Sequence, residues 1–254
     1  MSTGGGRFVR GMYLPRDALR DGYPFDLPVI SRILEPRGIS FPAGATFLVG
    51  ENGSGKSTLV EALAVAVGLN AEGGSQNHRF STRATESELG SAVTVITDGR
   101  TPRSRFFLRA ESFYNVATAA EEIGVDTVGG VSPHERSHGE SFVDLMRHRF
   151  FPGGLYLMDE PEAALSPQGC LAVVALMAEL VADGSQLIIA THSPILLALP
   201  GARIYEIDDD GEIDVVGYDE ALPVRMTRDF LADPARYLRH LGVPGAAPYQ
   251  TRDS

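Results

Sequence analysis

The chain has 254 residues, of which 43% are hydrophobic and 22% charged, a composition that supports a globular protein with a self-sufficient core. No apolar run approaches the roughly 18 residues of a membrane span, and the polar start is unlike a signal peptide, so we expect no membrane insertion. The net charge of −11 argues against non-specific adhesion to nucleic acid or anionic membranes.

Two rare residues carry further information. The single cysteine, Cys170, excludes an intramolecular disulfide and suits a cytoplasmic protein. Its apolar neighbours in a helical pattern predict that it packs as a small hydrophobe. Of the 22 basic residues, all are arginine except Lys56. A chain that uses arginine everywhere else keeps a lysine where a compact ammonium is needed, so Lys56 is a candidate functional residue.

The first part of the chain is predicted to begin a sheet. Residues 7–14 alternate loosely as in a strand, and a connector rich in Pro, Asp and Gly follows. An apolar run at 45–49 ends in a glycine-rich turn, after which 56–67 has helical spacing. This order is strand, loop, helix. The polar stretch 69–90 is expected to be a loop.

The middle of the chain, 91–151, is expected to form an inserted lobe. Residues 93–97 and 105–109 are predicted to pair as a β-hairpin, because an Asp-Gly pair and a proline lie between them. Residues 112–123 and 140–150 are predicted helices.

After residue 152 the alternation of strands and helices returns. The elements expected there are strands at 155–158, 186–190, 203–207 and 212–216 and helices at 167–181 and 227–241. Segments 8–90 and 152–241 then form the core of a single domain, 1–254, with a mobile tail at 1–7 and a frayed end at 242–254. The fold class is α/β, with a mostly parallel sheet, an antiparallel β part and a small inserted helical lobe.

The turn after the first core strand matches the phosphate-loop pattern G-x-x-x-x-G-K-[ST] in full. Its residues are Gly50, Glu51, Asn52, Gly53, Ser54, Gly55, Lys56 and Ser57, and Thr58 follows. Glycines let successive N–H groups point at phosphate oxygens, and the next helix presents its positive end to the same anion. Lys56 is expected to reach the β- and γ-phosphates, and the Ser57 hydroxyl to ligate magnesium.

A second candidate site element is the apolar run that ends in Asp159 and Glu160. At the carboxyl edge of a parallel sheet, Asp159 would face the magnesium shell beside the phosphate loop. Strand alternation alone points Glu160 elsewhere. Because Pro161 turns the chain, we expect Glu160 to approach the γ-phosphate and to orient or deprotonate the attacking water.

The third element is the apolar run 186–190, which is followed by Thr191, His192, Ser193 and Pro194. His192 is expected to contact the γ-phosphate from its own strand end and to report whether that phosphate is present. A loop histidine that caps a helix is the alternative interpretation.

With these residues in place, the chain resembles the ATP-binding-cassette (ABC) ATPases. Residues 161–166 resemble the family's D-loop, and Asp159 and His192 are 33 positions apart, close to the family's interval. Ser137-His138-Gly139-Glu140 begins 22 positions before Asp159, where the family has its LSGGQ or LSGGE signature. His138 replaces a glycine there, and Arg136 replaces the leucine. An ordinary helix N-cap is the alternative interpretation of this segment.

The resemblance implies a P-loop NTPase core that uses ATP and Mg2+. It extends from about residue 21 to 241, over which the chain looks like a group of short, stand-alone bacterial ATPases of the AAA-family or ABC type. It further implies an ATP-dependent homodimer, in which Ser137 and the backbone of Gly139 contact ATP held by the other copy. Glu160, His192 and Lys56 would then be the catalytic residues, and Ser57 and Asp159 the metal ligands.

The family's glutamine between the core and the helical lobe has no counterpart in 105–112. Glu111 is a weak substitute. The sequence does not identify the aromatic side chain that stacks on adenine. The candidates are Tyr13, Tyr23 and Phe25, and each is more commonly a core or hairpin residue.

The arginines allow two interpretations. Six arginines lie between the phosphate loop and the signature: Arg79, Arg83, Arg100, Arg103, Arg105 and Arg109. They form either a surface for a partner or nucleic acid, or ordinary solvated charges, and the second interpretation is favoured. Arg136 either approaches a γ-phosphate across the dimer or is an ordinary helix-start residue. Those near the C-terminus are predicted to form the wet face of the last helix; they are Arg225, Arg228, Arg236 and Arg239.

The leading functional hypothesis is a cytoplasmic Mg2+-dependent ABC-type ATPase whose dimer closure drives an unknown protein partner. A transporter's ATP-binding subunit and an ATPase of DNA maintenance or phage defence are alternatives, with DNA a further partner in the second case. A nucleotide sensor without hydrolysis is disfavoured because Glu160 is present. A P-loop small-molecule kinase is also disfavoured, because it needs neither the signature-like segment 137–140 nor the D-loop-like segment 161–166.

Overall fold

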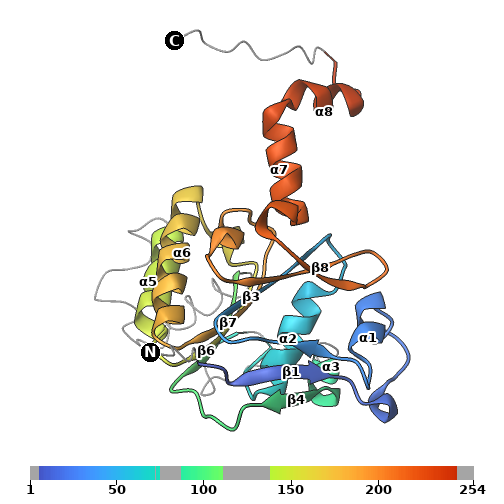
Figure 1. Cartoon of the computed structure of the whole chain (residues 1–254), viewed down its shortest axis with the longest axis vertical. Coiled ribbons are helices and arrows are strands. Elements are labelled where there is room, and N and C mark those ends of the chain that lie inside the picture. Colours follow the sequence, from blue (N-terminus) through green and yellow to red (C-terminus); the bar gives the residue numbers. More distant parts are fainter. Residues whose placement is uncertain (1–5, 72, 75–86, 111–137, 245–254) are drawn as a thin grey trace.

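A six-stranded sheet with the order β5-β6-β7-β3-β8-β9 lies at the centre of the molecule (Figure 1). The computed structural model describes residues 6–71, 73–74, 87–110 and 138–244. All neighbouring strands of this sheet run parallel except β8 and β9. The strands are β3 (Ala45–Gly50), β5 (Arg105–Arg109), β6 (Leu155–Asp159), β7 (Gln186–Ala190), β8 (Arg203–Ile207) and β9 (Ile213–Val216).

The three central strands are buried along their whole length, as continuous apolar runs in a parallel sheet should be. Side chains of each strand alternate between two core clusters. Leu48 and Leu157 face the cluster that contains α2, whereas Phe47 and Met158 face the cluster that contains α5 and α6. The sheet is therefore covered on both faces, which confirms the predicted α/β class.

The helices are α1 (Pro28–Ile33), α2 (Lys56–Ala66), α3 (Ser87–Ala92), α5 (His138–Arg149), α6 (Pro167–Ala182), α7 (Leu222–Ala232) and α8 (Pro234–His240). Short 3-10 turns occur at Arg16–Ala18, Pro161–Ala164, Leu196–Ala198 and Tyr218–Glu220. The expected loop 69–90 is partly wrong, since α3 begins at Ser87. Among the described residues, no helix is long and apolar enough to cross a membrane.

A second, antiparallel sheet has the order β2-β1-β4 and packs through the α2 cluster. Its strands are β1 (Val9–Tyr13), β2 (Ile39–Ser40) and β4 (Thr94–Thr97). The buried Gln186 side chain joins the two sheets: its amide oxygen accepts hydrogen bonds from the N–H groups of Phe8 and Val9, at 2.8 and 2.9 Å. Its amide nitrogen donates to the carbonyls of Val9 and Pro42, at 2.8 and 3.0 Å.

The predicted hairpin between 93–97 and 105–109 is wrong. β4 pairs with β1, whereas β5 pairs in parallel with β6, so the two strands belong to different sheets. Burial explains the difference. β4 is mostly exposed and suits an outer edge, while Phe106, Phe107 and Leu108 of β5 are buried and suit a parallel strand covered on both faces. Of the two helices expected in the lobe, α5 is present, and 112–123 lies outside the described residues.

The expected C-terminal helix 227–241 is two helices. α7 begins earlier, at Leu222, and ends before Asp233, whose side chain caps α8 by accepting a 3.0 Å hydrogen bond from the Arg236 N–H. Pro234 is the first residue of α8, a position where its missing N–H costs nothing. The four arginines of this region are exposed, as predicted.

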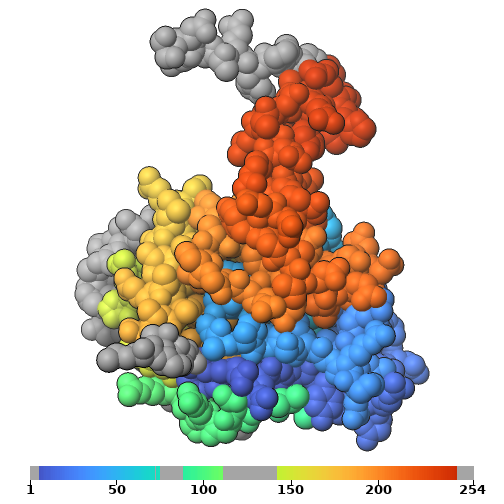
Figure 2. Space-filling view, in the orientation of Figure 1, coloured from blue at the N-terminus to red at the C-terminus, as the bar shows by residue number. Residues whose placement is uncertain are grey.

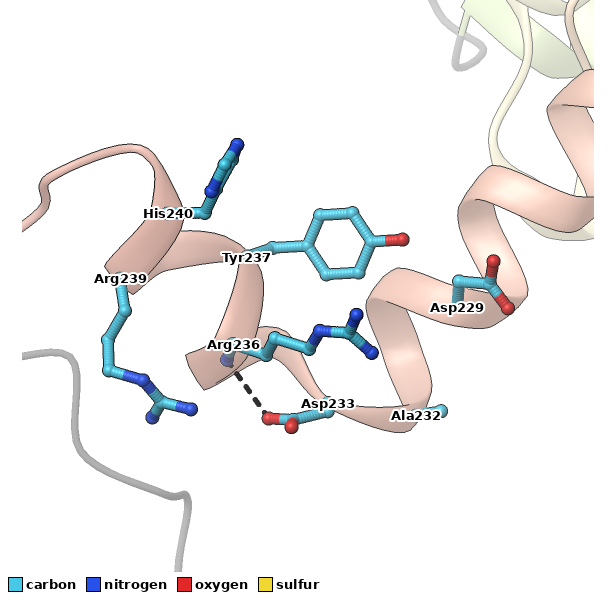
Figure 3. A pocket seen from close by; sticks show the side chains of 7 residues that line it. All are labelled: Asp229, Ala232, Asp233, Arg236, Tyr237, Arg239 and His240. Carbon is cyan, nitrogen blue, oxygen red and sulfur yellow. Dashed lines mark hydrogen bonds between the residues drawn. The ribbon is translucent and has the colours of Figure 1, made fainter.

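These two helices stand out from the body of the molecule as an arm (Figures 1 and 2). Figure 3 shows Tyr237 and Arg236 extending from α8 over a hollow lined also by Asp229 and Ala232 of α7. Of the side chains in α7 and α8, those of Val224 and Ala235 are buried.

Candidate nucleotide-binding site

The candidate site lies where β3, β6 and β7 end at the same edge of the sheet. In the strand order, β7 lies between β6 and β3, and all three are parallel. Their carboxyl ends carry the phosphate loop, the Asp159-Glu160 pair and the segment with His192. The sheet therefore brings together three segments that sequence analysis singled out separately. Such an edge is where ligands bind in open α/β sheets.

Two glycines of the phosphate loop are required by the structure. A Cβ on Gly50, which has a φ of 151°, would lie 2.3 Å from the Ile207 carbonyl oxygen. A Cβ on Gly55, which has a φ of 94°, would lie 2.6 Å from a methyl carbon of Val29. Both positions combine a left-handed backbone with close neighbours, so the loop keeps its curled shape only with glycine.

The loop ends at α2, which begins at Lys56. Glu51, Asn52 and Gly53 are exposed at its outer turn, while Ser57 and Thr58 are half-buried in the first turn of the helix. The first N–H groups of a helix have no intrahelical partner, and the Ser54 hydroxyl is buried without a hydrogen bond. These donors fit phosphate oxygens.

Lys56 is 3% exposed, and its Nζ donates a 2.9 Å hydrogen bond to the Glu51 carbonyl. Burial lowers the pKa of Lys56, while the carboxylates of Glu160 and Asp159 act in the opposite direction. A partly desolvated ammonium held across the phosphate loop is suited to bind a multiply charged anion, which would satisfy it better than one carbonyl does.

Asp159 ends β6 with a side chain that is only 7% exposed. It faces Arg109, the last residue of β5, with 3.5 Å between Arg109 Nε and Asp159 Oδ2. Arg109 also donates a 3.1 Å hydrogen bond from Nη1 to Oε2 of Glu61 in α2. The sequence gives no sign of this cluster. The favoured interpretation of Arg109 as a solvated charge is wrong, since its side chain is 16% exposed.

Glu160 has the left-handed backbone angles φ 46° and ψ 51°, which are uncommon for a residue other than glycine. This conformation ends the strand alternation, and the Glu160 N–H donates to the Ala190 carbonyl at 2.9 Å. Its Oε1 lies 3.5 Å from His192 Nε2, and the two side chains are 42% and 35% exposed. The structure thus brings Glu160 and His192 together at an accessible edge, and strain of this kind is common at functional sites.

Glu162 is a further residue that sequence analysis left without a role. Its Oε1 accepts hydrogen bonds from the Thr191 hydroxyl at 2.8 Å and from the His192 N–H at 2.5 Å. The turn Pro161–Ala164 is therefore tied directly to the segment that carries His192. The sequence signal was an acidic residue within 161–166, but its partner could not be read from the chain alone.

The remaining candidates are placed as follows. Gly139 lies in the first turn of α5, which begins at His138, two residues before the expected start. Ser137, Glu111, Arg136, Arg79 and Arg83 lie outside the described residues. Of the aromatic candidates, Phe25 is buried in the core, Tyr23 is 61% exposed and Tyr13 is half-buried. Arg100 and Arg103 are exposed, as the favoured interpretation predicted.

The residues present fit Mg2+ bound together with a nucleotide. Among the described residues, no group of three or more His, Cys, Asp or Glu side chains is arranged to hold a metal alone. Mg2+ commonly takes one or two protein oxygens and completes its shell with phosphates and waters. The Ser57 hydroxyl and the Asp159 carboxylate, at neighbouring ends of the site, offer such oxygens.

A phosphate loop between a parallel strand and a helix, beside a strand that ends in Asp-Glu, is the arrangement of a P-loop nucleotide-binding site and resembles that of the ABC-type ATPases. In agreement, a family model described as an AAA domain matches residues 32–118, which include the phosphate loop and Arg109.

Curated proteins that are similar to this chain include pyoverdine export ATP-binding/permease proteins PvdT. The one from Pseudomonas fluorescens Pf-5 is 35% identical over 105 residues, covering 41% of this chain and 16% of the relative. The one from Pseudomonas savastanoi pv. phaseolicola is 27% identical over 218 residues, covering 78% of this chain and 33% of the relative. The chain thus spans a third or less of these relatives, whose export and permease functions belong to them.

Solved structures of ABC transporters are also similar. A chain of a metal-chelate type transporter in an inward-facing conformation has 14% identity and a TM-score of 0.49, with 89% of this chain and 90% of that chain covered. A nucleotide-free ATP-binding cassette has 18% identity and a TM-score of 0.40, with 78% and 88% covered.

Proposed function

We propose that this protein binds ATP with Mg2+, hydrolyses it, and closes as a dimer around the nucleotide to drive a partner. The observation that carries the proposal is the convergence of Lys56, Asp159, Glu160 and His192 on one sheet edge. Asp159 and Glu160 stand at the end of β6, His192 follows β7, and Lys56 begins the helix after β3. Scattered residues of these types would not give the phosphate, metal and water contacts that hydrolysis needs.

The proposal gives each of these residues a role. Lys56 and the N–H groups of the phosphate loop hold the β- and γ-phosphates, while the Ser57 hydroxyl and Asp159 hold the metal. Bound Mg2+ supplies charge neutralisation on the phosphates. Glu160, displaced from the strand alternation, orients the attacking water or accepts its proton, and His192 contacts the γ-phosphate from the next strand end.

The dimer is the part of the proposal that needs a second copy. Ser137 and Gly139 would complete the site of the partner copy, as the resemblance to the ABC ATPases implies, and Gly139 lies in the first turn of α5. The Glu162 hydrogen bonds support it, because they join the D-loop-like turn to the His192 segment. A change at the γ-phosphate would then be transmitted to the surface that meets the other copy.

The similar proteins favour one second candidate, an ATP-binding unit that works with a membrane partner. Both curated relatives carry an ATP-binding and a permease part by their names. This candidate uses the same site, so it differs only in what the dimer drives. A permease that co-purifies with the chain would support it, and turnover stimulated by DNA would instead support a DNA-maintenance role.

The test is the molecular mass of Glu160→Gln in solution with and without Mg-ATP. The variant should bind ATP without hydrolysing it, so that its mass rises from one chain to two. Glu179→Gln, an exposed substitution on α6, should keep wild-type turnover and form no trapped dimer. If Glu160→Gln binds Mg-ATP and remains a monomer, dimer closure by the chain alone is contradicted.

A further inference from the structure

Three elements meet at one buried guanidinium. Arg109 ends β5 and is directly paired in register with Asp159 of β6. On its other side it contacts Glu61, which lies in the second turn of α2. All three side chains are largely buried, at 16%, 7% and 6% exposed for Arg109, Asp159 and Glu61. The cluster therefore connects the helix after the phosphate loop, the strand with the metal-site aspartate and β5.

Glu61 is a charged residue on an otherwise apolar part of α2. Glu61 stands among Leu59, Val60, Ala62 and Leu63, which are all buried in the core. A carboxylate in such surroundings is retained only with a partner of opposite charge, because an isolated buried charge is costly. Arg109 is that partner for two carboxylates at once, and the planar fork of a guanidinium is suited to bridge them.

The two contacts differ in a way that suggests an order. The Glu61 contact is a hydrogen bond of 3.1 Å, while the Asp159 contact is an ion pair of 3.5 Å. Because the Glu61 contact is the shorter of these two, we take Glu61 as the anchor of Arg109, whose Nε faces Oδ2 of Asp159. Carboxylates that ligate metals are commonly held by such outer contacts, and their loss typically weakens metal binding by about 10- to 100-fold.

We propose that Arg109 is a positioning residue that, anchored by Glu61, holds the Asp159 carboxylate ready for the metal of a bound Mg-nucleotide. The inference rests on the proposed function, because it concerns the same site. Two other roles are physically distinct. Arg109 could serve stability alone, or its positive charge could compete with the metal for Asp159, so that removing it would tighten Mg2+ binding.

The experiment measures the dissociation constant of a fluorescent ATP analogue in EDTA and in Mg2+, for the full chain and its variants. The ratio of the two constants is the gain in affinity due to the metal, which a purely structural residue does not change. Arg109→Met should keep the affinity measured in EDTA and lose at least about 10-fold of the metal-dependent gain. Arg109→Lys keeps the charge but cannot bridge both carboxylates, so an intermediate loss is expected.

The matched control is Arg105→Met, at the other end of the same strand. Arg105 pairs in register with Leu155, and its guanidinium bonds to the Val67 carbonyl at 3.0 Å, so its loss should leave the gain unchanged. Glu61→Gln should reduce the gain as Arg109→Met does. The double variant should be no worse than Arg109→Met, since both substitutions act through one contact.

The outcomes separate the hypotheses. If wild-type protein shows no metal-dependent gain, the proposed Mg-ATP site fails and this inference with it. If wild type shows the gain and folded Arg109→Met keeps or increases it, the positioning role alone is overturned. Should Arg109→Met not fold, Arg109→Lys and Glu61→Gln decide by the same ratio, with an unchanged gain in both overturning the role.

Discussion

At the scale of single residues, Lys56 combines burial with a position across the phosphate loop. Lys56→Met keeps most of the side-chain volume and removes the charge. Because the ammonium is expected to stabilise the transferring phosphate, turnover should fall by about 100-fold or more. The melting temperature should change little, because the substitution also removes a partly desolvated charge. Steady-state phosphate release and thermal unfolding of the same preparation check both parts, and turnover that survives the substitution would contradict the assigned role.

Residues also show where sequence reasoning succeeds and where it stops. Asp159 and His192 follow apolar runs directly, and Lys56 follows a third run after the phosphate loop, so pairing these runs in a parallel sheet places all three residues at one edge. The cluster of Arg109, Glu61 and Asp159 could not be predicted from the sequence. Its contacts depend on the register of β5 against β6, and a hairpin interpretation of 105–109 sent that strand to the wrong sheet. The signal that was present is a continuous apolar run before Arg109, which favours a buried parallel strand over a hairpin arm.

At the scale of elements, the antiparallel sheet is joined to the central sheet by the apolar core and by the buried Gln186 side chain. Gln186 makes four hydrogen bonds, three of them with Phe8 and Val9 and one with Pro42. Gln186→Leu would leave these buried backbone groups without partners, at about 1–3 kcal/mol for each group that water cannot reach. We expect a loss of about 3 kcal/mol or more in the free energy of unfolding, measured by urea denaturation. Gln168→Leu, an exposed glutamine on α6, is the control and should be nearly neutral.

The same element scale explains the other differences from the sequence-based picture. The pattern of 227–241 is helical throughout, but Pro234 cannot continue α7, and Asp233 provides a cap for a new helix. Helix propensity therefore predicts the two helical segments but not the break between α7 and α8. The link between Gln186 and β1 is a contact between residues 177 or more positions apart, which no local pattern encodes.

At the scale of the whole molecule, the arm of α7 and α8 is nearly separate from the body. The base of the arm is attached: Val224 is buried, and the Leu222 N–H donates a 2.6 Å hydrogen bond to the Glu206 carboxylate. Further out, Leu231 and Leu241 are 68% and 73% exposed. α8 packs on α7, where Tyr237 meets Phe230 edge to face with ring centroids 5.8 Å apart.

This attachment predicts that the two ends of the arm differ in their effect on stability. Ending the chain before Pro234 removes α8 and its contact with α7, so the melting temperature should fall by less than about 4 °C, which is about 1 kcal/mol for a domain of this size. Ending it before Leu222 also removes Val224 from the core and leaves Glu206 without its backbone donor, so a clearly larger fall is expected. Scanning calorimetry of the two truncated chains tests this. A shorter deletion that destabilises as much as the longer one would show that α8 belongs to the cooperative core, and the arm would then be a rigid part of the fold rather than an attachment to it.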